Sequence, residues 1–266
     1  MRIVSLSPSV TETLVLLGLE DEIVGITPWC RMYLERPENK KIAGTYLNIL
    51  YDVLEEISPD IVFLQSRVHD RFFRDLREKG FNTYLIPLPT NVYGIISHIV
   101  LDVGAIVGRY YESRELGAKS LERVSDMIRR SNTRKRPRIY VEYLWPDKTY
   151  STAGALTYID DGVRIAGGEN IFRDTPKEFF TPSNKEIIKR DPDIILVNIE
   201  PVMRNMTLSR YKEIRGELEE TRALRENRVV LVVESRRINL AHFGPSFIET
   251  IEWLRNTLNQ FHIADS

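Results

Sequence analysis

The stretches DVLEEISPDIVFLQ (residues 52–65) and KEIIKRDPDIILVN (residues 185–198) share one pattern, although they lie far apart in the chain. Each has one or two amphipathic turns, then a polar residue, Pro-Asp and an unbroken apolar run. Pro59 and Pro192 cannot continue a helix interior. The apolar runs suit strands that are buried on both faces, as in a parallel sheet. The pattern therefore predicts helix, tight turn and buried strand twice, in two similar α/β lobes.

The composition is that of a folded globular protein. The chain has 266 residues, of which 42% are hydrophobic and 28% charged, so it is not a disordered segment. Its 37 basic and 38 acidic residues nearly cancel, and no nucleic-acid partner is expected. The single cysteine, Cys30, excludes a disulfide framework and a cysteine metal cluster. No apolar stretch is long enough for a transmembrane segment.

The first lobe alternates strands with helices. Strands are predicted at 2–6, 22–26, 61–64 and 83–87, and helices at 10–18 and 70–79 in addition to the helix of the first quoted stretch. Ser9 is the predicted N-cap, with Glu12 three residues on as the partner in a capping box. Gly18 is placed as the C-cap. This alternation favours a layer of parallel strands and helices.

Residues 91–131 interrupt the alternation. Apolar side chains such as Ile95, Ile99 and Val103 recur at helical spacing, and a second, more charged helical stretch covers about 112–130. Gly104 and Gly108 are weak breakers between the two stretches. A flexible linker would be rich in Gly, Ser or Pro, so we expect this segment to be a stiff helical strut.

The second lobe repeats the order of the first. The pattern predicts a strand at 137–143, a loop, a helix over about 155–166 that ends in Gly, and a short strand at 170–172. After the second quoted stretch come a strand at 228–233 and a helix over about 246–261. We therefore predict an α/β fold of two Rossmann-like lobes with parallel sheets. The predicted domains are residues 1–90, a connecting segment at 91–133, and residues 134–266.

Several motifs carry a family resemblance that runs through nearly the whole chain. They are LSPSVTETLVLLGLEDEIVGI (6–26), LEEISPDIVFL (54–64), STAGALTYIDD (151–161) and above all AGGENIF (166–172). Together they resemble the helical-backbone class of periplasmic substrate-binding proteins, which serve ABC importers of vitamin B12, iron siderophores and haem, and the likeness is strongest to the cobalamin-binding members. The resemblance implies two lobes joined by a long backbone helix. It also implies that a metal chelate is held in a cleft between the lobes, without catalysis and without a resident cofactor or metal site.

The loops beyond the predicted strands carry the candidate site. Ligands of open α/β sheets bind outside the carboxyl ends of the strands. Aromatic and cationic side chains collect there, which suits a large planar ligand with amide or carboxylate arms. The predicted ligand-binding residues on these loops are Trp29, Arg31, Gln65, Arg67, Trp145, Arg236 and His242, and the family resemblance adds Tyr46.

The resemblance also compares individual positions. Trp29 stands where cobalamin binders have a tyrosine that contacts the corrin, and Tyr46 stands at one of their tryptophans. Gln65 replaces another tryptophan, so one stacking surface is lost. Arg31 stands where many relatives have an acid, which favours a more anionic ligand. Each aromatic residue also has a structural alternative, and Trp145 could instead pack inside its lobe.

Docking to a permease is a further implication of the resemblance. In the family, one acid on each lobe, seven positions before the Pro of Pro-Asp, meets arginines of the permease. The first lobe has Asp52 there, whereas the second has Lys185 with Glu186 beside it. A like charge facing an arginine opposes association. Either a shift of one residue restores the acid through Glu186, or the protein does not dock in this way.

Two functions remain open from the sequence. The first is capture of a metal chelate, with a corrinoid before haem or an iron siderophore, for an ABC-type importer. The second is a cytoplasmic protein or enzyme of corrinoid salvage that docks no permease, because the chain as written has no signal peptide. A leader removed from the protein would place it outside the cytoplasm. We expect a monomer. The histidines lack zinc-site spacing, although His69 or His242 could ligate a chelated metal axially.

Overall fold

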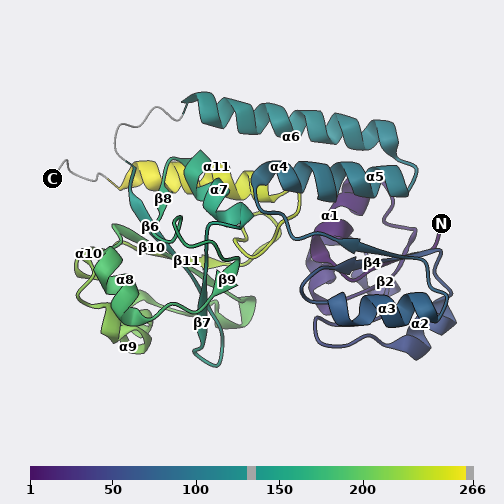
Figure 1. The fold of residues 1–266 in the computed structure, drawn as a ribbon, viewed down its shortest axis with the longest axis horizontal. Coiled ribbons are helices and arrows are strands. Elements are labelled where there is room, and N and C mark those ends of the chain that lie inside the picture. The colour runs from purple at the N-terminus through teal and green to yellow at the C-terminus, as the bar shows by residue number, and fades with distance from the viewer. Residues whose placement is uncertain (131–135, 262–266) are drawn as a thin grey trace. The chain divides into compact units, whose positions relative to one another are not determined.

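The computed structural model describes residues 1–130 and 136–261, which form two compact units (Figure 1). The N-terminal unit comprises residues 1–89, 93–121 and 242–245, and the C-terminal unit comprises the described residues of 90–92, 122–241 and 246–261. Much of the predicted connecting segment 91–133 thus belongs to the N-terminal unit. The predicted boundary at 133/134 lies outside the described residues.

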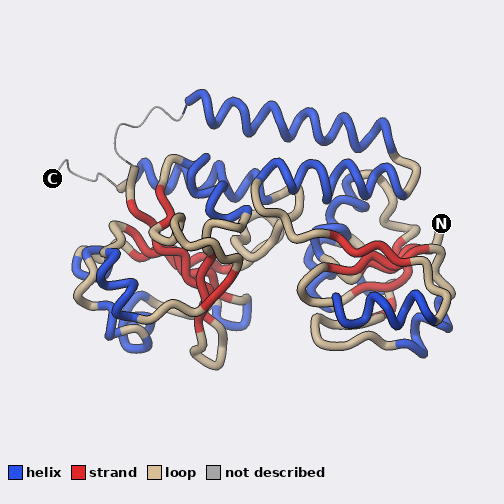
Figure 2. Tube along the Cα trace, in the orientation of Figure 1, coloured by secondary structure: helices blue, strands red, loops and turns tan. Residues whose placement is uncertain are grey.

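The N-terminal unit is built on a sheet of five parallel strands in the order β3-β2-β1-β4-β5. Helices cover both faces of the sheet (Figure 2). The core under α2 and α3 includes Val4, Leu54, Val62 and Leu76. The elements are β1 (Ile3–Ser5), α1 (Pro8–Leu16), β2 (Ile23–Ile26), η1 (Pro28–Tyr33), η2 (Pro37–Asn39), β3 (Lys41–Ile42), α2 (Tyr51–Ile57), β4 (Ile61–Gln65), α3 (Asp70–Glu78) and β5 (Thr83–Ile86).

The C-terminal unit has a mixed sheet in the order β11-β10-β6-β7-β9, with β8 also paired to β6. The strands β11, β10 and β6 are parallel, as expected. Strand β7 is antiparallel to both its neighbours, β6 and β9, because it returns along β6 after a tight turn. The elements are β6 (Arg138–Leu144), β7 (Tyr150–Ala153), α7 (Tyr158–Ala166), β8 (Glu169–Asn170), β9 (Phe179–Phe180), α8 (Asn184–Arg190), β10 (Ile194–Ile199), η4 (Pro201–Met203), α9 (Leu208–Ile214), η5 (Gly216–Leu218), α10 (Arg222–Arg225), β11 (Val229–Val233) and α11 (Phe247–Gln260).

The Pro-Asp segments at 59–60 and 192–193 make equivalent hydrogen bonds in the two units. In the first unit the Arg2 N–H donates to the Asp60 carboxylate at 2.6 Å, and the Asp60 N–H donates back to the Arg2 carbonyl at 2.8 Å. In the second unit Arg138 and Asp193 exchange the same two bonds, at 2.9 and 2.8 Å. The aspartate of each phrase therefore fixes the start of the neighbouring central strand.

The arginine of each pair also reaches the preceding helix. The Arg2 guanidinium donates to the carbonyl of Ile57, the last residue of α2, and Arg138 donates to the carbonyl of Arg190, the last residue of α8. A cation at a helix C-terminus satisfies a free carbonyl and interacts favourably with the helix dipole. The two units thus share side-chain chemistry as well as element order.

The segment 92–130 is a helical hairpin, not one continuous strut. Its first arm consists of α4 (Val92–Gly94), the π-helical turns η3 (Ile95–Leu101) and α5 (Asp102–Ile106), and its second arm is α6 (Tyr110–Arg130). Gly108 lies between the two arms and interrupts the helical conformation with φ +72°. Gly104 lies within α5 and is not a breaker, since the second arm passes so close that a Cβ there would meet Ser113 at 2.1 Å.

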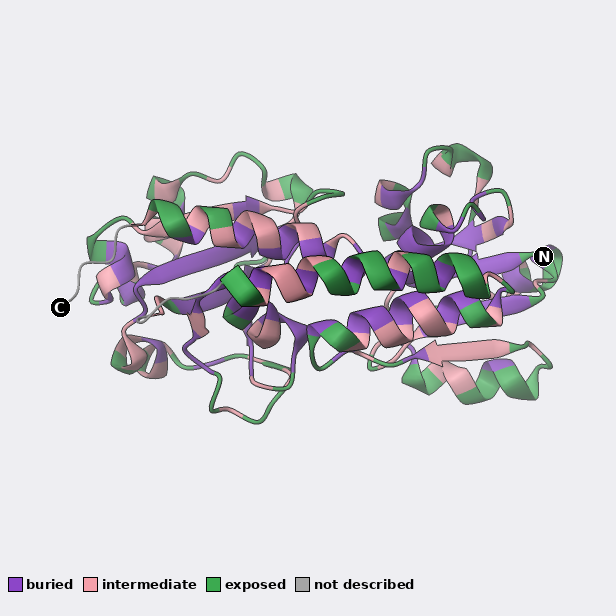
Figure 3. Ribbon diagram, turned by 90° about the horizontal axis from the view of Figure 1, so that it is seen from above, coloured by how far each residue is buried: buried purple, intermediate pink, exposed green. Residues whose placement is uncertain are grey.

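Helix α6 is the long helix that the sequence predicted. Buried residues recur along α6 with exposed and half-buried residues between them, and many of the exposed residues are visible from above in Figure 3. The boundary between the two compact units falls within this helix, between Leu121 and Glu122.

The first helix begins differently from the prediction. Helix α1 starts at Pro8 with Ser7 as its N-cap, and no side chain caps it. The predicted Ser9–Glu12 capping box is therefore wrong, because Pro at the first helical position starts the helix two residues earlier. At the other end Leu17 is the C-cap, so the predicted C-cap at Gly18 is one residue too late. Gly18 follows at φ +74° and its N–H donates to the Val15 carbonyl, which is the position that a glycine commonly takes just beyond a helix end.

Candidate functional site

The carboxyl edge of the first sheet contains a topological switch point. The chain runs from β1 outward through β2 and β3, then returns to place β4 on the other side of β1. Such a reversal opens a crevice beyond the strand ends, where ligands of α/β proteins bind. Here the Ser7 hydroxyl, just after β1, donates to the side-chain oxygen of Gln65, the last residue of β4, at 3.3 Å. The predicted residue Gln65 thus lies at the switch point.

Two predicted aromatic residues meet in this unit. The rings of Trp29, on η1 after β2, and Tyr46, in the loop after β3, stack with centroids 4.5 Å apart and planes 28° apart. Trp29 is 41% exposed and Tyr46 is half-buried. The pair therefore presents aromatic surface to solvent, where a flat ligand could stack on it.

The two predicted arginines of this unit come from the same set of loops. Arg31 follows Trp29 on η1 and is exposed. Arg67 follows β4, is exposed, and adopts φ +70°, a left-handed conformation that is uncommon for a residue other than glycine. Its N–H donates to the Asp70 carboxylate at 3.0 Å, which holds the turn into α3. Two guanidinium groups therefore lie on loops of the same sheet edge as the aromatic pair.

His242 belongs to the N-terminal unit although its sequence position is near the C-terminus. It is 4% exposed, its Nε2 lies 2.7 Å from the Glu12 carboxylate, and its ring stacks on Tyr33 with centroids 4.2 Å apart. The ring is thus packed and hydrogen-bonded inside the unit. At this exposure the ring offers almost no surface to a ligand.

The corresponding edge of the second sheet carries acids that the sequence analysis did not single out. Glu234 follows β11 and accepts a hydrogen bond from Asn198 of β10 at 2.8 Å. Burial raises the pKa of Glu234, and the nearby charge of Glu200 also raises it, while the bond from Asn198 opposes the shift. The signal available in the sequence was an acid directly after each of two buried parallel strands. The predicted residue Trp145 lies half-buried on the turn after β6.

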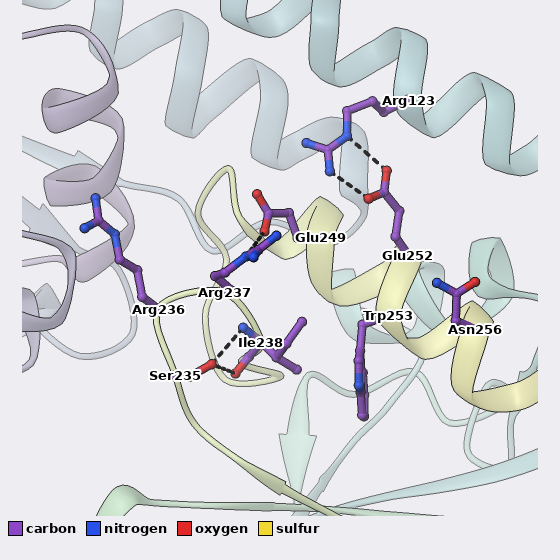
Figure 4. A pocket seen from close by; sticks show the side chains of 9 residues that line it. All are labelled: Arg123, Ser235, Arg236, Arg237, Ile238, Glu249, Glu252, Trp253 and Asn256. Carbon is purple, nitrogen blue, oxygen red and sulfur yellow. Dashed lines mark hydrogen bonds and ion pairs between the residues drawn. The ribbon is translucent and has the colours of Figure 1, made fainter.

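Arg236 is exposed on a tight turn after β11 that lines a surface groove of about 680 Å³ (Figure 4). The turn is held by the Ser235 hydroxyl, which accepts from the Ile238 N–H at 3.0 Å. The guanidinium of Arg236 points away from the other labelled side chains in Figure 4. The groove is lined by Arg123, Ser235, Arg236, Arg237, Ile238, Glu249, Glu252, Trp253 and Asn256.

The other charges of this groove are paired. Arg123 binds Glu252 through two bonds of 3.0 and 2.8 Å, and Arg237 binds Glu249 at 2.9 Å. The groove therefore offers little net charge to a ligand. Trp145 and Arg236 lie on separate turns of this unit, after β6 and after β11.

The candidate docking residues lie on equivalent helices. Both α2 and α8 have seven residues, and each is followed by a residue with positive φ, Ser58 or Asp191, just before the proline. Asp52 and Lys185 each stand second in their helix and are exposed. The helix starts thus show no shift of register that would align Glu186 with Asp52. Glu186 also binds Arg190 in its own helix at 2.7 Å.

Within residues 1–130 and 136–261, no cluster of three or more His, Cys, Asp or Glu side chains is arranged to hold a metal ion. No described helix is both long and apolar enough to cross a membrane.

Comparison with known proteins agrees with the two-unit α/β fold. The model of the periplasmic binding protein family matches residues 3–234. A cobalamin-binding protein of Halobacterium salinarum is 24% identical over 268 residues, which cover 98% of this chain and 69% of the relative. A vitamin B12-binding protein of Vibrio parahaemolyticus is 21% identical over 233 residues, which cover 86% of this chain and 79% of the relative.

Solved structures with the same fold include binding proteins for two kinds of ligand. The periplasmic heme-binding protein of Roseiflexus sp. superimposes with a TM-score of 0.83 at 22% identity, over 97% of this chain and 98% of its own. The periplasmic vitamin B12-binding protein of Vibrio cholerae superimposes with a TM-score of 0.79 at 17% identity. The superposition covers 97% of this chain and 96% of that protein. The fold and the family match agree with the resemblance that the sequence motifs carried. The chain belongs to the periplasmic binding protein family, whose members bind their ligands and are not enzymes.

Proposed function

We propose that this protein captures a metal chelate for an ABC-type importer, and that the chelate is cobalamin or another corrinoid. The observation that carries this proposal is the stacked pair Trp29 and Tyr46, half-open to solvent beside the switch point of the first sheet. A corrin ring is large and flat, so it can stack on such a surface. The names of the relatives from Halobacterium salinarum and Vibrio parahaemolyticus support the same ligand class.

The loops around the pair supply polar groups for the arms of the ligand. Arg31 and Arg67 offer guanidinium donors, and Gln65 offers an amide. Trp145, Arg236 and His242 remain predicted ligand-binding residues. His242 is packed against Glu12, and Arg236 lines a groove of the C-terminal unit.

Haem or an iron siderophore is the second candidate ligand. Arg31 and Arg67 are exposed cations on loops of the same sheet edge as Trp29 and Tyr46, and guanidinium groups bind carboxylates in a bidentate way. A ligand with carboxylate arms, such as haem, would use this chemistry better than the neutral amide arms of cobalamin. The relative affinities for the two ligands therefore test which arms the site prefers.

Asp52 is the candidate contact of the N-terminal unit with a permease, and Glu186, one residue beyond the position equivalent to Asp52, is the candidate of the C-terminal unit. The exposure of Asp52 at the start of α2 supports its role. Lys185 in the equivalent place of α8 favours the alternative of a corrinoid-handling protein that does not dock, because a lysine would repel a permease arginine.

Calorimetric titration of the purified protein with cyanocobalamin, hemin and a ferric siderophore tests the ligand. Trp29→Ala and Tyr46→Ala should each weaken binding of the preferred ligand by about two- to tenfold, because an aromatic contact is lost. Tyr111→Ala is the matched control, since Tyr111 is 81% exposed in the same unit and stands at the start of α6. It should leave the affinity unchanged.

Two results would count against the proposal. Dissociation constants no tighter than about a millimolar for all three ligands would reject the ligand class. Equal affinities for the Trp29→Ala, Tyr46→Ala and parent proteins would remove the aromatic pair from the site while leaving the ligand class in place.

A further inference from the structure

His69 connects two of the loops that form the candidate site. It follows β4, is fully buried, and directly precedes α3. The backbone N–H of Gln65 points at its Nδ1 at 3.1 Å, and the carbonyl of Thr45 lies 3.0 Å from its Nε2. A backbone N–H can only donate, so Nδ1 must be the acceptor. The ring proton is therefore on Nε2 and is donated to the Thr45 carbonyl.

This bridge ends next to the aromatic pair. Thr45 directly precedes Tyr46, whose ring stacks on Trp29. Gln65 is the last residue of β4, and its side chain accepts a bond from Ser7 at the switch point. A second bond supports the same loop, because the guanidinium of Arg71 donates to the Leu47 carbonyl. The imidazole thus joins the end of a rigid strand to the loop that presents Tyr46.

We propose that His69 is a proton-sensitive tie, in which the neutral ring holds the Tyr46 loop in place and the protonated ring releases it. Protonation would put a hydrogen on Nδ1, where the Gln65 N–H already points. Two donors then face each other and the bond to the strand is lost. The stacked surface of Trp29 and Tyr46 would lose its fixed position in acid. For ligand binding, this inference rests on the function proposed above.

The surroundings of His69 favour its neutral form. Burial lowers the pKa of His69, and the charge of Arg71 lowers it further, whereas the bond to the Thr45 carbonyl and the charge of Asp70 raise it. Asp70 and Arg71 are the charged neighbours on α3, and Arg67 is on the same loop as His69. The facing segments 43–50 and 61–65 contain no charged residue.

The direction of the pH effect follows from this shift. An unfolded histidine titrates near pH 6.5, and the folded group titrates lower. Above about pH 6.5 the ring is neutral in both states and the tie is complete. As pH falls below that value the unfolded chain binds a proton first, so stability declines, and the tie is lost once the pH passes the folded pKa.

The test in the ligand-free protein uses Trp29 as its own probe. Trp145→Phe and Trp253→Phe together leave Trp29 as the sole tryptophan of the three in the chain. Its emission should change in a single transition below about pH 6.5 as the tie opens. With His69→Gln added, the transition should vanish, because an amide can accept from Gln65 and donate to Thr45 without titrating.

The matched control is His98→Gln. His98 is partly exposed, belongs to the same unit, and pairs with Asp102 at 3.1 Å. The transition should persist in this variant. A transition that persists in His69→Gln as well would overturn the proposal. NMR of the parent protein requires no variant to fold, and it can report which ring nitrogen of His69 carries the proton. A proton on Nδ1 at neutral pH would also overturn it.

Binding of cyanocobalamin at pH 7.5 and at a pH below the midpoint of the Trp29 transition separates this inference from the proposed function. We expect the parent protein to bind roughly three- to tenfold more weakly at the lower pH, the effect of one lost hydrogen bond, and His69→Gln to bind equally at both. Binding that responds to pH equally in both proteins would overturn the role of His69 in ligand binding. If cyanocobalamin does not bind but the Trp29 transition behaves as expected, the corrinoid proposal fails and the tie stands.

Discussion

Glu142 is a carboxylate in the middle of β6 with no solvent exposure. The Tyr211 hydroxyl donates to one of its oxygens at 3.0 Å and the Arg215 guanidinium to the other at 3.0 Å. Burial raises the pKa of Glu142, while the charge of Arg215 opposes that shift. Arg215 also lies over the ring of Tyr150 at 3.6 Å and donates to Asn184, the first residue of α8. The ion pair therefore links the sheet interior to the start of a surface helix.

Replacing Arg215 by Met should lower the free energy of unfolding by about 3–5 kcal/mol, because the buried carboxylate loses its compensating charge. Arg210→Met is the matched control. Arg210 lies on α9 just before Arg215, and its pair with Glu213 is exposed, so its loss should cost at most about 1 kcal/mol. Urea denaturation of both variants measures the difference. Equal losses of unfolding free energy in the two variants would show that the buried Glu142–Arg215 pair stabilises the protein no more than the exposed pair does.

The single residues of the site were predicted with uneven success. Trp29 was identified from its place after a predicted strand and Tyr46 from the family resemblance, and the structure stacks them. The role of Glu12 was mistaken, because its partner His242 is separated from it by most of the chain. His69 was noted only as a possible metal ligand. Its two hydrogen bonds to backbone groups cannot be read from sequence, since they depend on how the loops meet.

At the scale of elements, the contact between α5 and α6 depends on one glycine. A Cβ at Gly104 would lie 2.1 Å from the Cβ of Ser113, far closer than two such atoms can approach. Gly104 was predicted to be a weak breaker, because an isolated glycine lowers the stability of a helix. Here it instead allows two helices to pack closely.

Gly104→Ala should therefore destabilise the protein by about 1–3 kcal/mol, through overpacking of the hairpin. Gly216→Ala serves as the control, because nothing lies within 4 Å of a Cβ built there. It should be neutral or slightly stabilising, as alanine reduces the freedom of the unfolded chain. Thermal unfolding monitored by circular dichroism distinguishes the two. If Gly104→Ala were as stable as Gly216→Ala, the close helix contact would not exist in solution.

The Pro-Asp phrases were the most predictable elements. Pro59 and Pro192 end their helices, and the buried strands β4 and β10 follow where expected. The strands β7 and β9 were missed, because β7 is short and partly polar and β9 has only two residues, so neither shows the long apolar run of a central parallel strand. Their antiparallel pairing depends on the turn after β6, not on their own composition.

At the scale of the whole molecule, each unit has its own hydrophobic core. One core contains Val4 and Val62, and the other contains Tyr140 and Val197. Proteins built of separate domains often depart from two-state unfolding. The tryptophans are well placed to report on this, because Trp29 belongs to the N-terminal unit, and Trp145 and Trp253 belong to the C-terminal unit.

We expect Arg215→Met to lower the urea midpoint seen by Trp145 and Trp253 more than the midpoint seen by Trp29. The mutation removes a contact in only one of the two cores. Fluorescence of proteins that keep either Trp29 alone or the other two tryptophans gives the two curves. Identical shifts in both curves would mean that the units unfold as one cooperative body.

The sequence by itself determined the duplicated α/β plan, the long helix near the middle of the chain and most of the strand ends from which the site loops arise, although not that of β3. These features depend on local patterns, since helix periodicity, proline stops and apolar runs act within a few residues. The tertiary structure alone decided the helical hairpin, the antiparallel edge of the second sheet, the burial of His242 and the bridge through His69. Each of these depends on backbone or side-chain groups that are distant in the chain and meet only after folding, so no local pattern contains them.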